Sequence, residues 1–186
     1  MPTNLIKNRD VFFFHQNKNI LTRFYTNFFL EGQPYAVGKI FKCGAWSPGS
    51  NFPSCLRIKK LQEVDYLEAC NMTLRRDLIF EVDGFDLNYT QTSEWCELDL
   101  AIRVKKLGYQ LVFNPRVMVK HYLSRQGTFT KRNASLHRLT NFLRFYFRHV
   151  FKFSLSYILR FSSYLFFLFS YWLYKTHMKT TYGWQK

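Results

Sequence analysis

The chain has 186 residues, which leaves room for one domain with a hydrophobic core and hardly for two. Its formal charge of +15 is uneven: residues 1–99 hold 11 Lys/Arg and 12 Asp/Glu, whereas residues 100–186 hold 16 Lys/Arg and no acid. The basic second half predicts an anionic partner, either a membrane surface or a nucleic acid, and the four widely spaced cysteines without a CxxC pair argue against a structural zinc site.

Residues 1–60 mix asparagines, aromatic residues and turn signals such as "CGAWSPGSNFPSC". This pattern predicts loops and short strands, with one helix around Lys18–Leu30. The first residues lack the charged and then apolar pattern of a secretory leader. We expect the cysteines to serve as small apolar residues in a reducing compartment.

Residues 61–123 are typical of an α/β domain. The stretch 64–76, "VDYLEACNMTLRR", predicts a buried strand with a polar end, and Asp77 is placed to cap the turn that comes after it. That turn is expected to stop at Asp83-Gly84.

A helix is predicted from Cys96 to Leu107, because apolar residues recur on one face while acids occupy the first turn and bases the last. Gly108 is expected to end it. Residues 109–113, "YQLVF", then predict a strand, Asn114-Pro115 a turn, and residues 117–122 a second strand.

The tail is rich in aromatic and basic residues. Residues 136–150 predict a basic amphipathic helix. The apolar segment 153–174 carries Arg160 and several Ser and Tyr residues, which favours an interfacial or shallowly inserted helix over a membrane span. The alternative is that both helices pack on a core or on a partner subunit without touching lipid.

The last three acids of the chain, Glu94, Glu97 and Asp99, fall within six residues at the start of the helix predicted from Cys96. Taken alone, this cluster fits a helix N-terminus that favours negative charge. Asp99 and Arg103 are four residues apart, which predicts an ion pair on one helical face.

Three segments share an order of motifs with a known family: "LEACNMTLRRDLIFEVDGFD", "EWCELDLAIRVKKLGYQLVFNP" and "VMVKH". Together they resemble the C-terminal half of the catalytic domain of inverting glycosyltransferases of family 2, over about residues 35–125. The resemblance implies a partial GT-A-like α/β fold, a mixed sheet with flanking helices, followed here by aromatic-rich C-terminal helices. We therefore expect residues 1–130 to be the acceptor-side part of such a domain and residues 131–186 to be membrane-associating helices.

The resemblance also implies a general base. The usual family segment is Glu-Asp-x-Asp-Leu-x-x-Arg, and its second acid takes the proton from the acceptor hydroxyl. Aligned on Asp99-Leu100-x-x-Arg103, this base falls on Glu97, whereas the first acid is replaced by Cys96. Glu94 is expected to supply part of the missing charge, and neighbouring acids to raise the pKa of the base.

Further site residues come from the same resemblance. Asn71, Asp86 and Trp95 are expected to bind the acceptor, Trp95 by stacking on a sugar face; a buried amide and a simple turn are the structural alternatives for Asn71 and Asp86. His121, at the end of a predicted strand, is expected to bind the metal or the diphosphate, or to be structural.

The donor-binding half of the family and its Asp-x-Asp motif, which carries Mg²⁺ or Mn²⁺ on the nucleotide-sugar, have no counterpart in this sequence. We expect a truncated or split form that needs a partner chain for donor binding and is inactive alone. Its acceptor would be a glycan or a lipid-linked sugar, at the cytoplasmic face of an anionic membrane.

The competing hypothesis is a non-catalytic basic protein that binds lipid or nucleic acid. Basic residues interleaved with aromatic ones can bind single strands by charge and stacking. The near-neutral first half and the lack of a recognised nucleic-acid motif make nucleic acid the less favoured partner.

Overall fold

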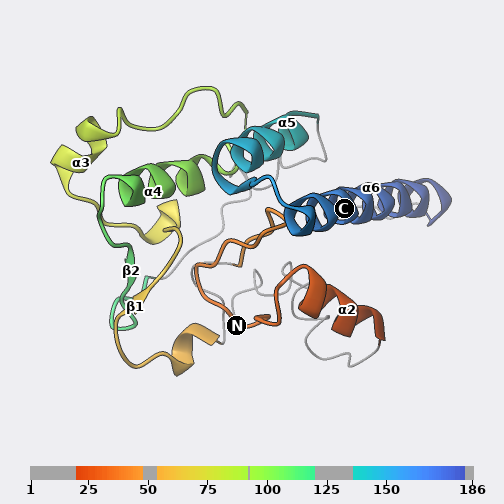
Figure 1. The fold of residues 1–186 in the computed structure, drawn as a ribbon, viewed down its shortest axis with the longest axis horizontal. Helices are drawn as coiled ribbons and strands as arrows, with labels where there is room; N and C mark the ends of the chain where they lie inside the picture. Colours follow the sequence, from red (N-terminus) through yellow and green to blue (C-terminus); the bar gives the residue numbers. More distant parts are fainter. Residues whose placement is uncertain (1–19, 48–53, 92, 120–135, 183–186) are drawn as a thin grey trace.

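The computed structural model describes residues 20–47, 54–91, 93–119 and 136–182. Within them the fold combines five α-helices with one small antiparallel sheet, and its C-terminal helices are rich in aromatic residues (Figure 1). The α-helices are α2 (Ile20–Phe28), α3 (Arg76–Glu81), α4 (Cys96–Lys106), α5 (Leu136–Phe145) and α6 (Leu155–Tyr182). Shorter turns are η2 (Ser54–Arg57), η3 (Ala69–Asn71) and the π-helical η5 (Tyr146–Val150). The prediction is thus shown only at the coarse level of helices combined with a small sheet.

Helix α4 lies at the centre of the main core. It is buried around most of its circumference, with Leu98, Leu100 and Val104 each at most 1 % exposed. The predicted boundaries are confirmed: Glu97 and Asp99 lie in the first turn, bases fill the last turn, and Gly108 follows with a φ of 93°. These local signals suffice because each acts within one turn of the helix end.

The sheet is smaller than predicted. It joins only β1 (Gln62–Glu63) to β2 (Val112–Phe113), antiparallel, with Gln62 opposite Phe113. The predicted strand over 64–76 is wrong: Val64 and Tyr66 are buried in alternation, but Asp65 donates its backbone N–H to the loop carbonyl of Gly38 at 2.7 Å instead of to a strand. The chain then turns into η3 and α3.

Two further details of the α/β region differ from prediction. Residues 117–119 form no strand, and the rest of that predicted strand lies outside the described residues. Asp77 does not cap α3; Arg75 holds the cap position, and Asp77 lies in the first turn with its carboxylate against the Arg75 guanidinium. The turns at Asp83-Gly84 and Asn114-Pro115 are confirmed.

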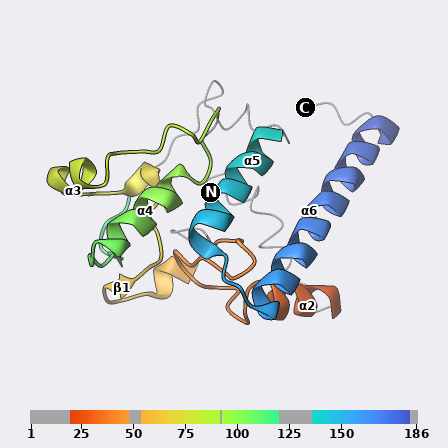
Figure 2. The same ribbon diagram turned by 45° about the horizontal axis from the view of Figure 1, so that its top comes forward.

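The C-terminal helices pack against the rest of the chain through aromatic rings. The amphipathic helix predicted over 136–150 is confirmed as α5 and η5, and Phe145 enters the core around α4. Helix α5 lies between α4 and α6, and α2 lies beside the start of α6 (Figure 2). The rings of Tyr146 and Phe161 stack at 3.9 Å between centroids, which fixes α6 against η5.

The helix predicted around Lys18–Leu30 is confirmed as α2, and the apolar segment 153–174 is helical from Leu155 on, as the first part of α6. Among the described helices, none is both long and apolar enough to cross a bilayer. Phe29, just after α2, packs against Tyr164 and Phe167 of α6, so these two helices share a second, mostly aromatic cluster.

The loop 41–46 lies in close contact with α5 and η5. A substitution in this loop therefore tests how the C-terminal helices pack. Gly44 has a φ of 86°, and a Cβ there would lie 2.7 Å from a ring carbon of Phe142 and 2.9 Å from one of Tyr146. We expect Gly44→Ala to lower the free energy of unfolding by about 2–4 kcal/mol, since a left-handed backbone and overpacking add. Urea unfolding followed by circular dichroism measures this loss.

The matched control is Gly32→Ala. Gly32 has a φ of 73°, but a Cβ there would meet no atom within 4 Å, so only the backbone cost of about 1–2 kcal/mol applies. If Gly44→Ala and Gly32→Ala lowered the free energy of unfolding equally, this would contradict the close contact between the 41–46 loop and Phe142.

Candidate functional site

The three clustered acids at the start of α4 reach three different parts of the chain. Glu94 forms an ion pair with Arg138 of α5. Glu97 accepts a hydrogen bond from the backbone N–H of Ala69 at 2.5 Å. Asp99 points into the core. The acids therefore tie the N-terminal end of α4 to η3, to α5 and to the centre of the fold.

Asp99 is fully buried and has four polar neighbours. Arg103 Nε donates to one of its carboxylate oxygens at 2.8 Å, as predicted for this pair. The other oxygen lies 2.6 Å from His149 Nε2, 3.2 Å from Arg148 and 3.4 Å from the hydroxyl of Tyr89. The same Arg103 donates to the backbone carbonyls of Val82 and Gly84. Asp99 thus joins α4, the loop after α3, and η5.

The ionisation of Asp99 is set by these contacts. Burial alone would raise the pKa of its carboxyl, but the hydrogen bonds from His149 and Arg103 outweigh burial and hold the pKa below the ordinary value. The carboxylate in turn raises the pKa of the Tyr89 phenol, after the larger effect of burial. Asp99 is therefore a charged group inside the core.

Trp95 occupies the cap position of α4 in the left-handed region, with a φ of 72°. Its ring packs against Phe142 at 5.6 Å, and its indole N–H is buried without a hydrogen-bond partner among the described residues. Gln91 and Ser93 also have positive φ, at 56° and 50°. Backbone strain of this kind gathers at binding and catalytic sites and requires support from the surrounding packing.

Asp86 lies in the loop between α3 and α4 and faces the C-terminal segment. Its carboxylate accepts from the backbone N–H of Asn88 at 2.9 Å, and it pairs with Arg148 of η5 at 2.6 Å. These contacts hold the pKa of Asp86 below the ordinary range, the Asn88 backbone bond contributing most. Asp86, like Glu94 and Trp95, thus contacts the helices after residue 136.

Asn71 and Glu97 lie on another side of α4. Asn71 is exposed at the end of η3, the turn whose first residue donates to Glu97. Burial, together with the nearby charges of Glu68 and Glu97, raises the pKa of the Cys70 thiol. The structure thus brings Asn71 and Glu97 to one place and Glu94 and Trp95 to a second, against α5, while Asp86 lies apart from both, against Arg148 of η5. His121 lies outside the described residues.

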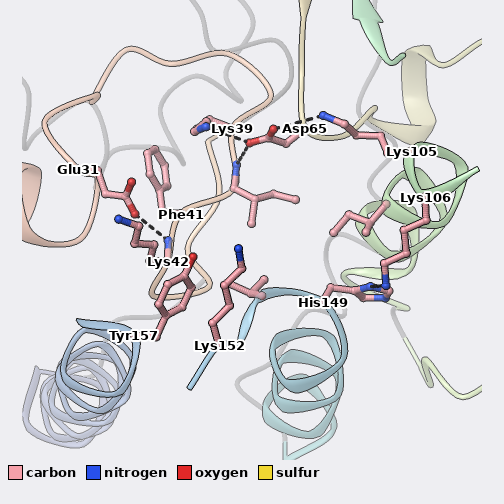
Figure 3. A pocket seen from close by; sticks show the side chains of 13 residues that line it. Glu31, Lys39, Phe41, Lys42, Asp65, Lys105, Lys106, His149, Lys152 and Tyr157 are labelled. Carbon is pink, nitrogen blue, oxygen red and sulfur yellow. Dashed lines mark hydrogen bonds and ion pairs between the residues drawn. The ribbon is translucent and has the colours of Figure 1, made fainter. Parts of the chain in front are cut away.

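A pocket of about 430 Å³ lies beside the other end of α4 and includes none of the residues predicted for the site (Figure 3). Lysines dominate its wall: Lys39, Lys42, Lys105, Lys106 and Lys152. His149 and Tyr157 line it as well. Sequence reasoning missed this pocket because its lysines come from three distant segments, and only the Lys105-Lys106 pair stands out locally.

Sequence reasoning also missed Asn141 of α5, which is 2 % exposed. Its side chain accepts from the backbone N–H of Thr90 at 3.3 Å and donates to the Thr90 carbonyl at 3.1 Å. This exchange fixes α5 against the strained loop that leads into α4. The sequence carries no signal for it, because position 141 falls with 137, 144 and 148 on the polar face of the helix predicted over 136–150.

The divalent cation that the family resemblance implies would need a group of side-chain ligands. Across residues 20–47, 54–91, 93–119 and 136–182, no three His, Cys, Asp or Glu side chains come together as a metal site would require. The described residues therefore do not fit this cation.

Comparison with family models, with curated proteins and with solved structures finds no match for this chain.

The buried carboxylate gives a direct test. We expect Asp99→Asn to lower the free energy of unfolding at pH 7 by about 3–5 kcal/mol, because it leaves Arg103 without its buried counter-charge. Since the folded-state pKa is depressed, the contribution of Asp99 is complete above the unfolded pKa and is lost as the pH falls through the folded value. Urea unfolding should show the two proteins converging below about pH 4.

Asp77→Asn is the control, since Asp77 is exposed and pairs with the exposed Arg75. It should change the free energy of unfolding only slightly, since solvent screens this exposed ion pair. Two results would contradict the role of Asp99 as a buried charge. One is that Asp77→Asn lowers the free energy of unfolding as much as Asp99→Asn does; the other is that the difference between Asp99→Asn and the wild type does not depend on pH.

Proposed function

We propose that this chain is the acceptor-side part of a family 2-like inverting glycosyltransferase of GT-A type, with Glu97 as the general base. The observation that carries the proposal is the position of Glu97 in the first turn of α4, against the η3 turn that bears Asn71. Two motifs that the family resemblance assigns to one acceptor site, 26 residues apart in sequence, are neighbours in space.

In the proposed reaction the acceptor hydroxyl attacks the anomeric carbon of a nucleotide-sugar, and the nucleoside diphosphate leaves from the opposite face. Glu97 takes the hydroxyl proton as the new bond forms. The N–H of Ala69 fixes one oxygen of this carboxylate, which orients the base. Asp99 and Arg103 act as positioning residues, because they hold α4 and the loop at Gly84 in register.

The donor and its divalent cation belong to the complete enzyme in this proposal. The donor-binding part would come from a further segment or a partner chain.

The test is Glu97→Gln in the complete enzyme, in which this chain acts together with its donor-binding part. A glutamine oxygen still accepts from Ala69 N–H, so the fold is kept while the base is lost. We expect the transfer rate from the nucleotide-sugar to fall about 100- to 10,000-fold, with an unchanged melting temperature. Release of the nucleoside diphosphate measures the rate.

Glu81→Gln is the matched control, because Glu81 is an exposed glutamate at the end of α3. It should transfer at the wild-type rate. If Glu97→Gln does the same, the general-base assignment is wrong.

We further propose that α6 associates peripherally with an anionic membrane, at its cytoplasmic face. One face of α6 packs on α5 and α2 through Phe161, Tyr164 and Phe167. A second face of α6 exposes large apolar side chains at helical spacing: Leu155, Leu159, Phe166, Phe169 and Leu173. An exposed apolar stripe on a basic chain suits the boundary between lipid headgroups and acyl chains. This observation favours lipid over nucleic acid in the competing non-catalytic hypothesis too.

Vesicle flotation tests the stripe. Leu159→Ser combined with Phe166→Ser should lower partition into vesicles containing anionic lipid at least tenfold, because each side chain loses about 1.5–3 kcal/mol of burial in lipid. The matched control combines Leu87→Ser with Phe80→Ser, which are 91 % and 70 % exposed on a different part of the chain. Equal partition of both double variants would count against α6 as the membrane-binding element.

A further inference from the structure

The lysine-lined pocket is the strongest feature that the proposed glycosyl transfer does not use. Its positive side chains converge from three segments. Lys39 and Lys42 come from the loop after α2, Lys105 and Lys106 from the last turn of α4, and Lys152 from the link between η5 and α6 (Figure 3). Placing five ammonium groups around one cavity is unfavourable unless negative charge offsets them.

The acids of the pocket offset only part of this charge. Asp65 lies 3.5 Å from Lys39 and 3.6 Å from Lys105, and Lys105 also pairs with Glu63 at 3.1 Å. Lys39 and Lys105 are therefore neutralised locally. Three lysines remain, Lys42, Lys106 and Lys152, and the one other acid among the lining residues is Glu31. Glu31 accepts from the backbone N–H of Lys42 at 2.9 Å.

Lys106 is held at the pocket wall by His149. The Nε2 atom of His149 lies 2.6 Å from the Asp99 carboxylate, so this nitrogen carries a proton. Its Nδ1 atom lies 3.4 Å from Lys106 Nζ and accepts from the ammonium group. The buried Asp99 thus orients the imidazole ring of His149, and this ring in turn holds Lys106 at the pocket wall.

Lys152 has no side-chain hydrogen bond or ion pair with the described residues, and its ammonium group points towards the middle of the pocket (Figure 3). A free ammonium group at the centre of a cavity is a ready partner for an oxyanion. Lysine binds phosphoryl oxygens as a point charge, and a volume of about 430 Å³ is ample for a phosphomonoester.

We propose that this pocket binds a phosphomonoester group, with Lys106 and Lys152 as its main contacts and Lys42 as a third positive charge. The phosphoryl group comes either from a small soluble phosphate ester or from the headgroup of a phosphomonoester lipid. Phe153 and Leu155, which lie between the lining residues Lys152 and Tyr157 in the chain, are exposed at 96 % and 71 % and would meet the lipid in the second case. The proposal rests on no part of the glycosyl transfer.

Binding of glycerol 3-phosphate to the full chain, measured by isothermal titration calorimetry, tests the site. We expect saturable binding that weakens at least tenfold in Lys106→Gln combined with Lys152→Gln, since two charge-assisted contacts are lost. Lys59→Gln combined with Lys60→Gln removes the same charge from exposed positions outside the pocket and should bind as the wild type does. The absence of saturable binding, or equal weakening in both double variants, would overturn the proposal.

Lys152→Gln alone separates binding from folding. Because Lys152 is exposed, this variant should keep the wild-type melting temperature while binding more weakly. Wild-type affinity in this folded variant would contradict the assigned contact.

Vesicles distinguish the two sources of the phosphoryl group in the same proteins. Phosphatidic acid presents a phosphomonoester, and phosphatidylglycerol, adjusted to equal surface charge, presents a phosphodiester. A preference for phosphatidic acid that Lys106→Gln with Lys152→Gln abolishes supports the pocket with a lipid headgroup. Saturable glycerol 3-phosphate binding without such a preference supports it with a soluble ester.

Discussion

The buried carboxylate of Asp99 connects α4 to the C-terminal part of the chain. It is 0 % exposed and joins Arg103 of its own helix to Arg148 and His149 of η5. Arg103 extends the network to the backbone of the loop after α3. A charge in a core is tolerated only where every oxygen has partners of this kind. The contacts around one side chain therefore set the relative positions of α4, the loop before it and the C-terminal helices.

The helices of this chain could be predicted from sequence because their signals are local. The bounds of α4 are set by its buried face, its charged ends and Gly108, and the extent of α5 with η5 is set by apolar spacing. The sheet could not be predicted in this way. Val64 and Tyr66 alternate as strand residues do, yet whether such a segment joins a ladder depends on distant partners. Here the carbonyl of Gly38 takes the hydrogen bond that a neighbouring strand would take.

The residues of the candidate sites also differ in how much local signal the sequence carries for them. The clustered acids before and within α4 are conspicuous in sequence, but their partners Arg138, Arg148 and His149 come about 40 to 60 residues later and carry no motif. The lysine pocket has still less local signal, since it gathers residues from positions 39 to 152. The acceptor site proposed at Glu97 comes from the order of motifs in the sequence, whereas only the fold shows that cationic side chains converge at the opposite end of the same helix.

The π-helical turn η5, Tyr146–Val150, has a consequence for how this chain can vary in length. A wide turn places Arg148 and His149 on Asp99 while Tyr146 stacks on Phe161 of α6. Removing one residue there would tighten the turn towards α-helical geometry and rotate the residues that follow it within η5 by about 100° around the helix axis. Arg148 and His149 would then turn away from Asp99. The length of this segment is therefore constrained as strictly as its composition, since even the exposed Phe147 packs on Phe151 and Phe161.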